Sequence, residues 1–227
     1  MVFTEEHVRA NIRVRDGKRV FFLAAGDLLT PAAKSFLRQE RIEVRPAAEA
    51  KIQEYETLFG AKLQNKPEHM THLRANVLVM KDHPRIRFRG LIDTLEAEIL
   101  LCMKEADGDI LEQLRQILQF VRELIPADVL EEPVKMQKLC GLTFDEIRER
   151  SHFPQKYYDQ PHFMPDGTES RLLLQMNKCR TVVRQTELAA FDAFKTPDGK
   201  VVREDILTAL NRLSSLFWIL MIREKAK

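Results

Sequence analysis

Glycine, cysteine and an excess of charge of either sign are all scarce in this chain of 227 residues, which has 8 glycines, 3 cysteines and a formal net charge of +2. Glycine falls to about half of its usual ~7% share, which excludes a collagen-like protein and favours helices. Three scattered cysteines are too few for a disulfide framework and indicate a reducing compartment. A nearly balanced charge lacks the strong basicity that is typical of nucleic-acid-binding proteins.

Long apolar runs are also missing. The longest runs from Leu216 to Ile222 (LFWILMI), far short of the ~20 residues that span a bilayer. The acidic start, Met1 to Glu6, has no basic stretch followed by an apolar one, so we expect no signal peptide. Hydrophobic residues make up 44% of the chain, enough for a full core. We therefore expect a cytoplasmic protein with no membrane partner.

The first third of the chain predicts a small α/β unit. An apolar run and a later alternating segment are typical of two strands, and a Thr-Pro pair between them is a good helix start. These elements are a strand at 20–23, a helix at 32–39 opened by Thr30 and Pro31, and a strand at 41–45. Residues 47–68 are polar and predict a linker with one short helix, so the first domain is expected to span residues 1–68.

The rest of the chain, residues 69–227, shows helical periodicity and predicts a helical bundle. Residues 151–168 carry prolines and aromatics without a period, and predict a long loop. The predicted helices are one from 84 that ends before Asp107-Gly108-Asp109, one from 110 that closes near Pro126, one at 143–150 with a capping box, and two at 169–195 and 203–224 joined by a turn at 196–200.

The strongest chemical pattern lies in the first helix of that last pair. Arg180, Arg184 and Glu187 stand at i, i+4 and i+7, so they share one face. One turn earlier that face is apolar, with Leu173 and Met176. Charges on such a face are costly to bury unless they are paired or used.

A second polar interruption, Asn211-Arg212-Leu213-Ser214-Ser215, lies in the last helix at a matching distance from the turn. If the two helices pack antiparallel, it comes within about one helical turn of Glu187. Guanidinium groups suit phosphate oxygens, and amide and carboxylate groups can orient a sugar or base, so we expect a nucleotide phosphate here. The alternative is a set of solvated ion pairs on the surface.

Several motifs resemble those of one enzyme family, the ATP:cob(I)alamin adenosyltransferases. The segment 180–187 resembles the R-x-x-x-R-x-x-E motif of the propanediol-utilisation type, and 210–214 resembles its L-N-R-L-S motif. Residues 81–93 resemble its K-D-x-P-R-I…G-x-x-D segment. Thr71-His72-Leu73 and the stretch 205–215 resemble the ethanolamine-utilisation branch more closely.

The resemblance implies a mainly α protein, a five-helix bundle that usually forms a homotrimer with ATP at subunit interfaces. It implies transfer of the 5′-deoxyadenosyl group of ATP to cob(I)alamin, with Mg²⁺ and with cobalamin as a substrate, in the service of ethanolamine utilisation. Arg180, Arg184 and Glu187 are then the catalytic residues. Asn211 and Arg212 join the nucleotide site, and Asp93 pairs with an arginine, expected to be Arg180, across the interface.

The family's other binding elements are matched less fully. Its glycine-rich phosphate loop is absent here, which leaves Thr71 and Lys81 as candidates to approach phosphate. The aromatic loop offers His162 and Phe163 for the corrin ring, unless that loop only packs on the bundle. The branch's cysteine metal motif has no counterpart at 60–68, and His69-x-x-His72 alone is a weak pattern, so we expect no bound metal.

Two other function classes can be compared with this one. The bundle could be a non-catalytic scaffold or a cofactor-delivery protein of a bacterial microcompartment, with the first domain docking to the shell or to a cobalamin-dependent lyase. The missing metal motif and phosphate loop favour that alternative. Nucleic-acid binding ranks last, because the sequence shows neither a basic stripe nor an aromatic platform.

Overall fold

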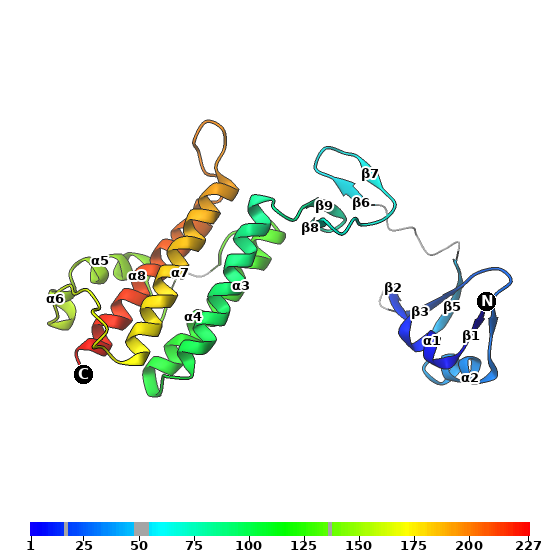
Figure 1. Ribbon diagram of the computed structural model, residues 1–227, viewed down its shortest axis with the longest axis horizontal. Helices are drawn as coiled ribbons and strands as arrows, with labels where there is room; N and C mark the ends of the chain where they lie inside the picture. The colour runs from blue at the N-terminus through cyan, green and yellow to red at the C-terminus, as the bar shows by residue number, and fades with distance from the viewer. Residues whose placement is uncertain (16–17, 48–54, 136–137) are drawn as a thin grey trace. The chain divides into compact units, whose positions relative to one another are not determined.

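The computed structural model describes residues 1–15, 18–47, 55–135 and 138–227. The chain forms two compact units, Met1–Lys66 and Pro67–Lys227 (Figure 1). Each unit is described by itself below. The domain boundary predicted between residues 68 and 69 stays a prediction.

The first unit is a small α/β structure around a core of its own. Strand β3 pairs in parallel with β5 and antiparallel with β2, and β1 pairs in parallel with β4. Helix α2 begins where the Thr30 side chain accepts a hydrogen bond from the Ala33 N–H. The predicted strand–helix–strand order is confirmed. Its elements are β1 (Val2–Phe3), α1 (Glu5–Ala10), β2 (Arg13–Arg15), β3 (Lys18–Leu23), β4 (Leu28–Leu29), α2 (Pro31–Gln39), β5 (Glu43–Pro46), β6 (Tyr55–Thr57) and β7 (Lys62–Leu63).

The predicted linker at 47–68 differs from the structure. Strands β6 and β7 form an antiparallel hairpin, and the short helix predicted for this segment is absent from residues 55–68. The part of that prediction that falls on residues 48–54 lies outside the described residues. Strands of two or three residues are too short to show an alternation of apolar and polar residues in the sequence. The β6–β7 hairpin could therefore not be predicted from such a pattern.

The second unit is a helical bundle preceded by the hairpin β8–β9. Helices α3, α4, α7 and α8 lie side by side, and α5 packs on α8 (Figure 1). The predicted five-helix architecture is confirmed by α3, α4, α5, α7 and α8. Its elements are β8 (Met70–Arg74), β9 (Val77–Met80), α3 (Pro84–Met103), α4 (Gly108–Val129), β10 (Lys138–Leu139), β11 (Leu142–Thr143), α5 (Phe144–His152), α6 (Pro154–Tyr158), α7 (Arg171–Phe194) and α8 (Glu204–Lys225).

Two predicted boundaries in this unit are wrong. Helix α4 continues through Pro126 to Val129, because proline removes a hydrogen bond without preventing one more turn near a helix end. The predicted loop at 151–168 contains the short helix α6, which starts with Pro154 in its first turn. Proline is favoured at that position because its fixed φ suits the start of a helix.

Side-chain caps begin α3, α5 and α7. Thr143 and Glu146 form the predicted capping box of α5, and Ser170 accepts a hydrogen bond from the Leu173 N–H at the start of α7. At the start of α3, His83 Nδ1 accepts from the Arg85 N–H at 3.2 Å. Burial and the charge of Arg85 lower the pKa of His83, which keeps the imidazole a neutral acceptor.

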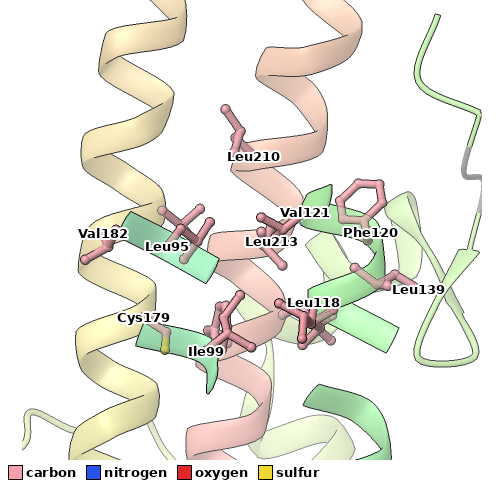
Figure 2. Close-up of a cluster of buried hydrophobic side chains, with 14 of the residues drawn as sticks. Leu95, Ile99, Leu118, Phe120, Val121, Leu139, Cys179, Val182, Leu210 and Leu213 are labelled. Carbon is pink, nitrogen blue, oxygen red and sulfur yellow. The ribbon is translucent and has the colours of Figure 1, made fainter. Parts of the chain in front are cut away.

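The bundle core consists of apolar side chains from every long helix. In the view of Figure 2, Leu95 lies between Val182 and Leu213, and Phe120 and Leu139 lie on the other side of Leu213. Helix α8 is long and apolar enough to cross a membrane. Its most apolar stretch of 18 residues has a mean hydropathy of 1.3, and 56% of that stretch is buried inside the structure. Its apolar residues are therefore accounted for by the core.

A buried carboxylate near the end of α4 binds the start of α3. Asp128 in α4 is fully buried and accepts hydrogen bonds from Arg85 Nε at 2.9 Å and Arg89 Nε at 2.7 Å, both from α3. Arg203, in the connection to α8, donates to the Ala127 carbonyl at 3.0 Å. The end of the bundle is thus held by charged groups that are costly to bury alone.

We predict that Asp128→Asn lowers the free energy of unfolding by about 3 kcal/mol, because two partly buried guanidinium groups lose the buried counter-charge that they share. The measurement is urea unfolding followed by circular dichroism. Glu112→Gln is the matched control, since Glu112 forms an exposed pair with Arg115 that is worth about 0.5 kcal/mol or less. Equal effects of the two substitutions would contradict the prediction.

Candidate functional site

The two polar interruptions of the last helix pair meet in the structure. Asn211 Nδ2 in α8 donates to Glu187 Oε1 in α7 at 3.0 Å, and Arg212 Nη1 donates to Asn211 Oδ1 at 2.6 Å. The three side chains form a row of hydrogen bonds along an open groove between α7 and α8, in the order Glu187, Asn211, Arg212. The amide is therefore oriented, with its NH₂ toward the carboxylate and its oxygen toward the guanidinium.

The two arginines of α7 lie next to this chain of contacts. Arg180 is held by Asn177, whose Oδ1 accepts from its Nε at 3.2 Å and from its Nη2 at 3.0 Å. Burial and the nearby charge of Arg184 lower the pKa of Arg180. Among the described residues, no carboxylate lies within ion-pair distance of Arg180 or Arg184. Two adjacent cations without a counter-charge make a suitable site for an anion.

Aromatic rings form one wall of the groove. His162 and Phe163, from the loop before α7, both stack on Trp218 of α8, with ring centroids 5.9 Å and 5.1 Å from the indole. Trp218 Nε1 donates to His162 Nδ1 at 3.3 Å. The Arg180 guanidinium carbon lies 5.7 Å from the centroid of the same indole. The loop does pack on the bundle, and it does so at the groove itself.

Two neighbouring cavities occupy the groove. The larger has a volume of about 590 Å³ and the smaller about 340 Å³, and both are lined by His152 and Ser215. Their other lining residues are Ser151, His162, Phe163, Met164, Pro165, Asn177, Arg180, Arg184, Ser214 and Trp218 in the larger, and Arg148, Glu187, Leu207, Thr208, Asn211 and Arg212 in the smaller. The larger combines arginines with aromatics, and the smaller is mainly polar.

Three predicted site residues lie elsewhere in the same chain. Thr71 pairs with Val79 in the β8–β9 hairpin, and Lys81 Nζ lies 3.3 Å from Glu68 Oε1. Both residues precede α3. The first turns of α3 lie beside the end of α7, because Phe88 of α3 packs edge-on against Phe194 of α7. The helical rise puts Arg180 and Arg184 roughly 15–20 Å further along α7.

Asp93, the third of these residues, is exposed on α3. The buried residues of that helix, Phe88, Ile92 and Leu95, face the core, and Asp93 lies on the outer side of the helix. Its carboxylate is thus accessible from outside the bundle. The predicted pair with Arg180 is not formed within one subunit, where Arg180 binds Asn177 instead.

Sequence reasoning missed Trp218 and Asn177, and it named Ser215 only as the end of the second polar interruption. Each follows a simple spacing rule from a residue that was found: Asn177 is three residues before Arg180, and Ser215 and Trp218 are four and seven residues after Asn211. Residues at these spacings share a helix face. The single tryptophan of the chain was hidden in an apolar run that otherwise belongs to the core.

Metal-ligating side chains do not gather anywhere in the part of the chain that the structure describes. His72 Nδ1 bonds the Ala75 carbonyl at 2.9 Å. Cys102 and Cys179 are buried in the bundle core, and contact with Cys102, together with burial, raises the pKa of Cys179. Burial also raises the pKa of the Cys140 thiol to about 12. These thiols are placed as core groups, away from the groove.

Comparison with known proteins gives consistent results. A family model described as cobalamin adenosyltransferase matches residues 61–224. The corrinoid adenosyltransferase EutT of Salmonella typhimurium strain LT2 is 31% identical, over 99% of this chain and 92% of that protein. EutT of Escherichia coli strain K12 is 30% identical over the same shares.

A solved structure is similar in fold. It is a variant of the PduO-type ATP:corrinoid adenosyltransferase from Lactobacillus reuteri, complexed with cobalamin and ATP. The TM-score is 0.53 and the identity 17%, over 69% of this chain and 88% of that one.

We predict that the three cysteines of the native protein resist a thiol reagent at pH 8. At that pH only about 1 in 10,000 Cys140 side chains is a thiolate if the pKa is about 12, and Cys102 and Cys179 are buried. The measurement counts thiols with a chromogenic disulfide, first in buffer and then in urea, where all three should react within minutes. Rapid reaction of a thiol in the folded protein would contradict this placement.

Proposed function

Because the chain belongs to the cobalamin adenosyltransferase family and is a corrinoid adenosyltransferase of the ethanolamine-utilisation branch, we propose that the groove between α7 and α8 binds ATP and corrinoid. The observation that carries this proposal is the pair Arg180 and Arg184, without a carboxylate partner in the described residues, beside the Glu187–Asn211 hydrogen bond. In this proposal the arginines bind the triphosphate, and Glu187, Asn211 and Arg212 orient the nucleoside.

The chemistry asks little of the protein beyond positioning and charge. The reaction forms a bond between cobalt and the ribose C5′ and breaks the bond from C5′ to the triphosphate, which leaves as an anion. Cob(I)alamin is the nucleophile, so no general base is required. Arg180 and Arg184 stabilise the charge that grows on the leaving oxygens. Mg²⁺ would arrive with the triphosphate, whose oxygens are its preferred ligands.

The aromatic wall is our candidate for the corrin side of the groove. His162, Phe163 and the exposed Met164 line the larger cavity together with Trp218. An apolar and aromatic surface favours contact with a large flat macrocycle and excludes water from it. Thr71 and Lys81 are kept as candidates for phosphate contacts contributed by another subunit, since they lie far from Arg180 within one chain.

A homotrimer is supported by apolar side chains on the outer faces of α3 and α7. Leu188 is 71% exposed, Leu101 55% and Phe191 42%. Leu188 also lines a shallow cavity of about 740 Å³ with Leu91 and Ala189. Exposed apolar groups on adjacent helices mark a surface that a further copy can cover. Such packing would also bring an outside partner to Asp93.

We propose that the enzyme works in the cytoplasm, including the interior of a bacterial microcompartment. The family match begins at residue 61, and the unit Met1–Lys66 has its own core. That unit is therefore the part of the chain free to dock to a microcompartment shell or to a cobalamin-dependent lyase. The non-catalytic scaffold is not proposed, because the family and the curated relatives support an enzyme.

The decisive experiment incubates the protein with ATP, Mg²⁺ and chemically reduced cobalamin without oxygen. We expect the absorption spectrum of adenosylcobalamin and release of triphosphate. No product under complete reduction would overturn the proposed activity.

We predict that Arg184→Ala lowers kcat/KM for ATP by roughly 100-fold, because one of two guanidinium groups on the leaving triphosphate is lost. Circular dichroism should show an unchanged fold, since Arg184 is exposed. Arg171→Ala on the same helix is the control: Arg171 is exposed and pairs only with Glu105, so its activity should match the wild type. A fully active Arg184→Ala enzyme would rule out the proposed phosphate site.

We predict that Leu188→Glu converts the trimer into monomers, because a charge would be buried in the subunit interface. The measurement is light scattering after size-exclusion chromatography. Val202→Glu is the control, since Val202 is 65% exposed but lies in the connection before α8, away from the outer helix faces. A monomeric wild type, or a trimeric Leu188→Glu variant, would contradict the proposed assembly.

A further inference from the structure

Trp218 of α8 contacts two other segments of the helical unit, the loop before α7 and α7 itself. It projects from α8 seven residues after Asn211, so the two share a helix face. Its indole stacks with His162 and Phe163 of the loop and lies under the Arg180 guanidinium of α7. The ring is half-buried and lines the larger cavity. One side chain therefore contacts both the aromatic loop and a proposed triphosphate ligand.

The hydrogen bonds around His162 fix its tautomer. An indole N–H can only donate, so His162 Nδ1 must accept at 3.3 Å. The neutral imidazole then carries its proton on Nε2, which donates to the His152 carbonyl at 3.2 Å. A single neutral tautomer satisfies both contacts. His162 thus connects the loop to α8 on one side and to the end of α5 on the other.

The other end of the loop has its own anchor. Glu169 accepts from the backbone N–H groups of Asp166 and Gly167, both at 3.1 Å, and pairs with Lys225 Nζ at 3.0 Å. Met164, between the two anchors, is 89% exposed and lines the larger cavity. The loop is thus fixed at two points and presents an apolar side chain between them.

The same indole also makes a cation–π contact with the Arg180 guanidinium, which depends on the charge of that group. An anion bound at Arg180 competes with the ring for the guanidinium charge, so nucleotide binding would change the strength of this contact. The same ring is stacked on His162 and Phe163. Trp218 is therefore the one side chain that links the Arg180 contact to the two loop contacts.

We propose that Trp218 is a positioning residue that couples nucleotide binding at Arg180 to the placement of the loop that faces the corrinoid. The proposal rests on the proposed function of the groove. It adds that the loop reaches its binding geometry through the Trp218–His162 contact, so the affinity for corrinoid depends on an indole that is not itself one of the phosphate ligands.

Trp218 is the only tryptophan in the chain, so its fluorescence reports the contact directly. In the wild type we expect Mg-ATP to change the emission of Trp218, in a saturable titration, without cobalamin present. In His162→Leu, which removes both ring hydrogen bonds from an exposed loop, we expect emission at longer wavelength. The KM for cob(I)alamin should rise about 10-fold, and the Kd for Mg-ATP from calorimetry should rise about threefold, because coupling between two sites is reciprocal.

Two substitutions of Trp218 separate positioning from simple packing. Trp218→Phe keeps a stacking ring and should raise the KM for cob(I)alamin about threefold. Trp218→Leu loses the ring, and should raise that KM at least 10-fold and the Kd for Mg-ATP about threefold, since Arg180 loses its cation–π contact. Partial rescue by phenylalanine, with an unchanged melting temperature for His162→Leu, distinguishes this role from a structural one. His7→Leu, the same change at an exposed histidine of the first unit, is the control and should leave all constants unchanged.

The outcomes separate this inference from the proposed function. If the wild type makes adenosylcobalamin but His162→Leu and Trp218→Leu keep both constants within twofold, the inference is wrong and the function stands. If the wild type makes no product but Mg-ATP still changes the emission of Trp218, the function fails and the coupling at Arg180 is supported. If neither is seen, both are overturned.

Discussion

The antiparallel packing of α7 against α8 is the constraint on which the rest of the site depends. Each helix carries an apolar stripe interrupted once by polar residues, and the register set by the apolar contacts puts Glu187 opposite Asn211. A shift of one residue along either helix would rotate its side chains by about 100°. The amide would then leave the groove, and Trp218 would leave the loop that it holds. Core packing and binding geometry are therefore one and the same requirement here.

Much of the fold followed from local rules. The caps at Thr30 and Thr143 and the periodicity of α3, α7 and α8 are short-range signals, and the structure contains each of them. Hairpin β6–β7 and helix α6 were missed because elements of two to five residues carry almost no periodic signal. In the groove, helix spacing brought Glu187 and Asn211 together. The partners of Trp218 could not be predicted, since the path of the loop is set by tertiary contacts between distant segments.

The structure of one chain contains only part of the proposed site. Arg180, Arg184, Glu187 and Asn211 lie together on two helices, whereas Thr71 and Lys81 belong to the other end of the bundle. That separation follows from rigid helices rather than from a mobile loop, so no small adjustment within the chain can close it. In the proposed trimer, assembly through the exposed leucines of α3 and α7 would supply a route, if a second copy placed its own bundle end at the first copy's groove.

The buried Asp128 cluster, formed with Arg85 and Arg89, also affects the order in which parts of the bundle fold. Its hydrogen bonds join residues 43 and 39 positions apart in the chain, whereas the Glu187–Asn211 contact closes over only 24. Shorter loops cost less entropy to close. We therefore expect the α7–α8 hairpin to order first during folding, and the end held by Asp128 to close late. Contacts that form after the transition state chiefly slow unfolding. The cluster would then lower the unfolding rate of the bundle, and so extend the lifetime of a groove that forms earlier in folding.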